Sequence, residues 1–192
     1  YEVLIAMSFQ NQFTKTTTDA NLMETVHHGS AEYPFRYYYE NIALFDFKCI
    51  DWHWHSELEF IYIESGNVVF DIGTVHFELN EGNGIMINSK ILHRLQSSSD
   101  AIIPNFLFQP SFIAPQDSLI YKKYINPVIS SSLEYLVFQP DIPWQKKALE
   151  IIKTIIAVQE TEFNREIIVS MSVQQLWILL LENLTFDQFE NM

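Results

Sequence analysis

One short stretch of the chain is decisive for the fold, and between residues 52 and 66 it reads WHWHSELEFIYIESG. Side chains two positions apart point to the same face of a β-strand, so His53 and His55 project together while the tryptophans that alternate with them project oppositely. Glu59 has the parity of the histidines, provided that no bulge intervenes. Turn residues then end the apolar run. We therefore predict two successive strands that carry two imidazoles and one carboxylate on one face.

A second stretch, between residues 82 and 93, supplies a third imidazole and reads GNGIMINSKILH. Gly82 begins a short apolar strand, and His93 comes after it on an adjacent strand. Three imidazoles and a carboxylate suit a divalent transition metal, such as Zn, Ni, Fe or Mn. The predicted metal ligands are His53, His55, Glu59 and His93. The alternative is that these side chains line the interior and hydrogen-bond to one another and to water.

Short β-type runs surround both stretches and are separated by turn residues. The predicted strands cover residues 36–40, 42–48, 52–55, 58–64, 68–72, 75–79, 85–88 and 102–108. Short strands at this spacing, rich in Val, Ile, Phe and Tyr, are typical of an antiparallel sandwich or barrel of the jelly-roll type. Trp52 and Trp54 are expected to pack under the N-terminal arm or a helix rather than to bind a ligand.

The last third of the chain has helical periodicity. Apolar residues three and four positions apart predict a helix over residues 144–159 and another over 165–184, with Asn164 as the N-cap of the second. A short helix over residues 117–125 is expected to end at Asn126-Pro127. The predicted organisation is an arm over residues 1–30, a barrel over 31–115 and an antiparallel helical segment over 116–192.

The second helix is predicted to have apolar residues on more than one face, because residues 176–181 are all apolar. One face is expected to rest on the first helix and another on the barrel. We expect the remaining apolar positions to form a homodimer interface. These residues are Trp177, Leu180, Leu181 and Leu184. The alternative is a monomer in which the loop around residues 130–132 covers them.

The composition of the 192 residues narrows the classes of function. The formal net charge is −13, from 24 acidic and 11 basic side chains, so the chain itself is a poor partner for nucleic acid. A single cysteine, Cys49, excludes an internal disulfide framework. No apolar run approaches the roughly 20 residues of a membrane span, and no secretory signal is seen, which predicts a cytoplasmic protein. Because the chain starts at Tyr1 rather than Met, we expect a fragment of a longer protein.

The spacing of the candidate ligands resembles the first motif of the cupin family, His-x-His-x3-Glu-x6-Gly, which is matched here by His53, His55, Glu59 and Gly66. The second cupin motif is similar to residues 82–97, where its glycine and histidine are kept. Three of its positions differ and are occupied by Asn88, Lys90 and Ser97. More widely, residues 27–185 resemble the N-terminal domain of AraC/XylS-family transcription regulators.

The resemblance implies a sensory jelly roll that binds a small, sugar-like effector and dimerises through its helices. It also implies a C-terminal DNA-binding domain with two helix-turn-helix motifs, which we expect outside this chain. The candidate effector-binding residues are His53, His55, Glu59, His93, Tyr37 and Tyr39. The competing hypothesis is a small metal-dependent cupin enzyme, a dioxygenase or an isomerase, and we favour the sensor without catalytic activity. We assign no site to His27, His28 or His76.

Overall fold

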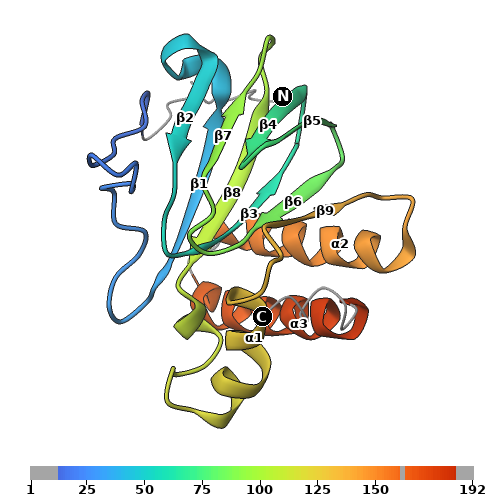
Figure 1. The fold of residues 1–192 in the computed structure, drawn as a ribbon. Coiled ribbons are helices and arrows are strands. Elements are labelled where there is room, and N and C mark those ends of the chain that lie inside the picture. The colour runs from blue at the N-terminus through green and yellow to red at the C-terminus, as the bar shows by residue number, and fades with distance from the viewer. Residues whose placement is uncertain (1–12, 161–162, 185–192) are drawn as a thin grey trace.

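Two antiparallel β-sheets face each other in the computed structural model, which describes residues 13–160 and 163–184 (Figure 1). The five-stranded sheet has the order β1-β8-β3-β6-β9 and the four-stranded sheet the order β2-β7-β4-β5. The first sheet contains β1 (Phe35–Asn41), β3 (Leu58–Tyr62), β6 (Gly84–Ile87), β8 (Ile102–Phe108) and β9 (Tyr135–Phe138). The second contains β2 (Cys49–His53), β4 (Asn67–Ile72), β5 (Val75–Asn80) and β7 (His93–Gln96). The predicted fold class, mainly β with a cupin-type jelly roll, is confirmed.

Alternation along β3 shows how the five-stranded sheet separates two cores. Ile61 belongs to an apolar cluster inside the barrel, together with Phe70 and Leu95 of the opposite sheet. Phe60 has the other parity and packs in a second cluster, against the helices. Glu59 has the parity of Ile61, so it also faces the barrel interior. A strand covered on both faces is buried throughout, and Leu58–Ile61 is buried at every position.

Two helices lie side by side along the outer face of the five-stranded sheet (Figure 1). They are α2 (Pro143–Ala157) and α3 (Arg165–Asn183), as the periodicity predicts, and the 3-10 turn η5 (Val158–Glu160) follows α2. The buried residues of α2 have helical spacing, at Ala148, Leu149, Ile152 and Ile155. No helix in the described ranges is long and apolar enough to span a membrane.

Several local predictions were wrong. Residues 42–48 do not form a strand but two 3-10 turns, η1 (Ile42–Leu44) and η2 (Asp46–Lys48), and the Asn41 side chain accepts a hydrogen bond from the backbone N–H of Ala43 at the start of the first. Strand β7 was expected at His93 but without bounds, whereas β9 was not predicted and joins the sheet from beyond the expected barrel boundary at residue 115. Asn164 precedes α3 in a left-handed conformation (φ 64°) and makes no side-chain capping bond.

The segment between β8 and β9 also differs from its prediction. A 3-10 turn, η3 (Pro110–Phe112), is followed by one turn of π-helix, η4 (Tyr121–Ile125), and this leads directly into α1 (Asn126–Ile129). Asn126-Pro127 therefore begins a new helix directly after η4, because proline is compatible with the first turn of a helix, where the backbone N–H has no intrahelical partner.

Three of the four predicted dimer residues lie in the core of the protomer. Trp177, Leu180 and Leu184 are at most 8% exposed, and Trp177 Nε1 donates to the Tyr124 carbonyl at 3.0 Å. The expectation that these three contribute uncovered surface is therefore wrong, because the segment from Tyr121 to Ile129 packs against α3. Leu181 is half-buried. The exposed large apolar side chains of α3 are Ile167, Met171 and Ile178.

Candidate metal and effector site

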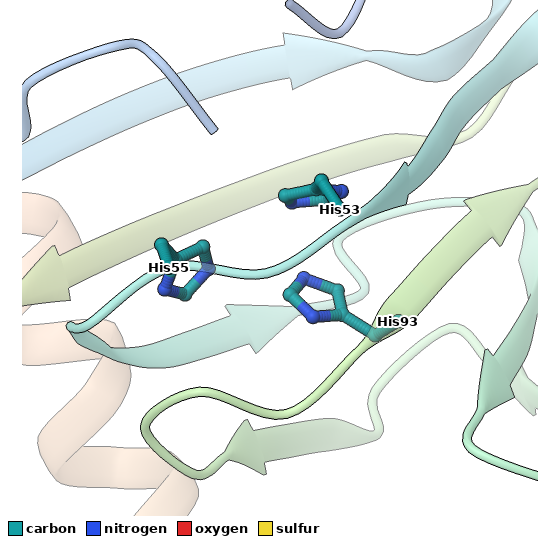
Figure 2. Close-up of side chains that lie close together, drawn as sticks. All are labelled: His53, His55 and His93. Carbon is teal, nitrogen blue, oxygen red and sulfur yellow. The ribbon is translucent and has the colours of Figure 1, made fainter. Parts of the chain in front are cut away.

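Three histidines meet inside the barrel (Figure 2). His53 ends β2, His93 begins β7 opposite it, and His55 lies in the loop that follows β2. Their candidate ligand atoms all lie within 4.8 Å of one another, and all three residues are at most 4% exposed. The ring centroids of His53 and His93 are 4.2 Å apart. The prediction that these three imidazoles converge is therefore confirmed.

Backbone carbonyl groups fix the tautomer of each ring. The Nδ1 atoms lie 2.8–3.2 Å from carbonyl oxygens, and the pairs are His53 with Asp51, His93 with Ile91 and His55 with Glu57. A carbonyl oxygen can only accept a hydrogen bond, so Nδ1 carries a proton in every ring. This leaves Nε2 as the position for a ligand, which is the arrangement found around protein-bound metals. Burial, followed by the proximity of His93 and His55, lowers the pKa of His53 well below 6.5, so this ring is neutral.

Glu59 completes the cluster. Its Oε2 lies 3.3 Å from His55 Nε2 and 3.2 Å from His93 Nε2. Burial alone would raise the pKa of Glu59, but when His55 and His93 also carry a proton on Nε2, their attraction for the carboxylate outweighs burial and holds its pKa well below 4.5. His93 Nε2 is fully buried and, despite the short distance, makes no hydrogen bond of acceptable geometry.

The four side chains fit a bound cation. In a ring that carries only its Nδ1 proton, Nε2 presents a lone pair, as does the carboxylate of Glu59. Two lone pairs this close repel unless a proton or a metal ion lies between them. Neutral imidazoles and a carboxylate suit Zn, Ni, Fe or Mn, and the orphaned His93 Nε2 is an available donor atom.

The N-terminal arm closes this site, and it contributes a histidine that the sequence analysis missed. His28 Nδ1 lies 2.9 Å from the Tyr38 hydroxyl and His28 Nε2 lies 2.9 Å from Glu24 Oε2. The His28 ring is 5.8 Å from the His55 ring, centroid to centroid. Trp54 anchors the arm to the barrel, because its indole N–H donates a hydrogen bond to the Asn21 carbonyl at 2.9 Å. The expected packing of Trp54 under the arm is confirmed for the described part of the arm; residues 1–12 lie outside the described ranges.

The remaining predicted effector residues do not reach the interior. Tyr37 packs against the helix-side cluster, and Tyr39 is 40% exposed and donates its hydroxyl hydrogen to Glu64.

The inward side chains of β1 are Tyr38 and Glu40, which have the opposite parity. Together with Glu24, His28, His53 and Asn105 they line a cavity of about 40 Å³ beside the histidines. A ligand pocket for a drug-sized molecule is commonly about 300–1,000 Å³, so the cavity in this closed form has room only for an ion or water.

The two facing sheets define the class of the protein by its fold, which is a cupin-type jelly roll with three imidazoles turned inward. Residues 45–116, which include most of the barrel strands, match the family model described as the AraC-like ligand binding domain. The resemblance seen in the sequence is thereby confirmed.

Individual relatives agree with this assignment. An uncharacterized HTH-type transcriptional regulator, YdeC of Bacillus subtilis, is 31% identical over 179 residues, which cover 90% of this chain and 61% of the relative. This chain thus spans about three fifths of the length of that protein. Among solved structures, apo ToxT K231A from Vibrio cholerae superposes on 86% of this chain and 60% of its own, with a TM-score of 0.53 and 8% identity. At that identity the likeness concerns the fold alone.

Proposed function

We propose that this chain is the effector-sensing and dimerisation domain of an AraC-type transcription regulator, whose DNA-binding domain lies outside this chain. The observation that carries the proposal is the buried cluster of three imidazoles and Glu59 inside an AraC-like barrel that is closed by its own arm. The printed name of the Bacillus subtilis relative supports a role in transcription. The net charge of −13 agrees with a domain that does not itself contact DNA.

The effector we propose is a small, sugar-like metabolite, and the arm is its lid. Arm residues Phe13, Lys15, Glu24 and His28 form one wall of the small cavity. An effector larger than a few water molecules fits only when these side chains move away. Effector binding and the closed arm therefore exclude each other, and occupancy of the barrel is coupled to the position of the arm.

A divalent metal is part of this proposal. His53, His55, His93 and Glu59 would hold it. When bound, such an ion supplies Lewis-acid binding of an oxygen atom of the effector. The chain's own residues would orient the ligands through the three Nδ1–H bonds to backbone carbonyls.

Dimerisation is proposed through a corrected set of residues on α3. Ile167, Met171, Gln174, Ile178 and Leu181 are spaced by alternating steps of four and three residues, which is the period of a coiled-coil seam. Ile167, Met171 and Ile178 are more than half exposed, so the seam is available to a second copy of the chain.

The second candidate is a metal-dependent cupin enzyme, and the inward set of Nε2 atoms is the observation that favours it. The test compares transcript profiles of the source organism with the wild-type gene, a gene deletion and a genomic His53→Ala/His93→Ala variant. A sensor predicts that the deletion changes specific transcripts and that the double variant, present at normal abundance, no longer responds to growth conditions that change them in the wild type. Unchanged transcripts in the deletion strain would contradict the regulator assignment and favour the enzyme.

A further inference from the structure

A buried carboxylate of β1 has no role in the histidine cluster. Glu40 is 7% exposed and faces the cavity, and its carboxylate accepts a hydrogen bond of 2.9 Å from Asn105 Nδ2 of β8. Asn105 is itself 2% exposed and also donates to the Ile103 carbonyl at 3.1 Å. The strand register places the two side chains on one face, because β1 and β8 pair Tyr38 with Asn105 and Glu40 lies two positions beyond Tyr38 on the same face.

His28, which is hydrogen-bonded to Glu24, is the basic side chain whose charge favours ionised Glu40, and no lysine or arginine pairs with Glu40 within the described ranges. The ion pairs found there do not include it, and Lys15, which also lines the cavity, is an exposed arm residue. The other acidic side chains at the cavity are Glu24 and Glu59. A buried carboxylate without a cation costs stability, and such a group is commonly kept for binding or catalysis.

We propose that Glu40 and Asn105 form the recognition pair for the effector, and that they select a group that donates hydrogen bonds, an ammonium or a hydroxyl, and reject a carboxylate. The inference rests on the proposed sensing function and defines its ligand class. The side-chain oxygens of both residues accept hydrogen bonds, and the cavity wall carries three carboxylates against one exposed lysine and the histidines His28 and His53. An anionic group at this position would meet an excess of like charge, whereas a cation would supply the ion-pair partner that Glu40 lacks.

The test uses three probes with one two-carbon skeleton: ethanolamine, ethylene glycol and glycolate. Each is titrated into the purified chain, and binding is followed by the chemical shifts of backbone amides around the cavity. We expect ethanolamine to bind at least tenfold more tightly than glycolate, with ethylene glycol between them. Glu40→Gln keeps the size and a hydrogen bond to Asn105 but removes the charge, so most of this preference should be lost.

The matched control is Glu57→Gln. Glu57 is equally buried and accepts a hydrogen bond of 2.6 Å from the amide of Gln109, but it does not line the cavity. Its variant should keep the preference of the wild type. Glycolate binding as tightly as ethanolamine, no binding of any probe at 100 mM, or an unchanged preference in Glu40→Gln would each overturn the proposal. Because the assay needs neither DNA nor transcription, its failure is distinguishable from failure of the regulator assignment.

Discussion

Burial raises the pKa of Glu40 to about 7; the hydrogen bond from Asn105 opposes this rise, while the carboxylates of Glu59 and Glu24 add to it. The folded-state pKa is therefore above the unfolded value near 4.5, so the folded protein binds more protons between these two pH values. Stability falls as the pH rises through this window, and the full cost is present above pH 7. A shift of this size corresponds to about 3 kcal/mol.

Glu40→Gln should remove this cost. We expect the melting temperature of the variant to exceed that of the wild type by roughly 4–10 °C at pH 8 and to differ little at pH 4.5. Thermal unfolding followed by circular dichroism at the two pH values measures the effect. Glu150→Gln, an exposed change on α2, is the control and should be neutral at both. An equal melting temperature at pH 8 would mean that Glu40 is compensated in the folded protein.

Sequence reasoning could assign residues whose partners lie nearby along the chain, but not residues whose partners lie far away along the chain. His53, His55 and Glu59 lie within seven positions, so the sequence alone predicts that they come together, although His55 lies in a loop and Glu59 faces His53 from the opposite sheet. Tyr37 and Tyr39 were assigned without knowing which face of β1 points inward, and the parity was wrong. His28 could not be predicted, because its burial depends on the arm folding back to Tyr38 and His55.

Among the elements, the arm is held by few bonds and is the part that we expect to move. Two backbone hydrogen bonds join it to Trp54, from the Glu24 N–H to the Trp54 carbonyl and from the Trp54 N–H to the Leu22 carbonyl. The indole adds its bond to Asn21 and its apolar surface. Trp54→Ala removes the indole only, at a cost of about 1–2 kcal/mol to arm closure.

Hydrogen exchange measures this opening. In Trp54→Ala the amide of Glu24 should exchange about 5- to 30-fold faster than in the wild type, because opening is more frequent by that factor. Trp52→Ala is the control: Trp52 lies beside Arg94, 5.5 Å from the guanidinium, and its loss should leave the arm unchanged. Equal exchange of Glu24 in the Trp54 variant and the wild type would contradict the anchoring role.

Helix α3 presents different faces to the core and to a second protomer. Ile178 is 56% exposed whereas Leu180 is 1% exposed. Ile178→Asp should therefore weaken dimerisation at least tenfold, as seen by sedimentation equilibrium at micromolar concentration, and leave the melting temperature nearly unchanged. Leu180→Ala should instead destabilise the protomer by about 2–5 kcal/mol. A wild-type chain that sediments as a 22.5 kDa monomer would contradict the dimer.

The predictable elements were those with a complete periodic pattern. Helices α2 and α3 and strands β4, β5 and β8 lie within one or two residues of their expected bounds. Residues 42–48 have a strand-like composition, but the Asn41 side chain accepts a hydrogen bond from the Ala43 N–H, and this bond competes with the hydrogen-bond ladder of a strand. The buried faces of α3 could not be chosen from its sequence, because a helix with apolar residues all round does not indicate which neighbour covers which side.

For the whole molecule, the charge distribution leads us to expect no direct contact with DNA. With a net charge of −13, this chain should show no sequence-specific binding to duplex DNA at physiological salt, measured by fluorescence anisotropy with fragments from the upstream region of its own gene. A longer polypeptide that includes a basic helix-turn-helix domain should bind. Nanomolar, sequence-specific binding by this chain alone would contradict the division of roles.

The claim that the buried histidines and Glu59 form a ligand-binding centre is tested most directly by a zinc titration of the chelator-treated chain, followed by calorimetry. The arrangement of the Nε2 atoms and the carboxylate predicts one Zn²⁺ per chain, with binding at least about tenfold weaker in His93→Ala and unchanged in His76→Ala, whose histidine is exposed beside Asp71. A folded wild-type chain that binds no zinc, or a His93→Ala variant that binds it equally well, would contradict the account.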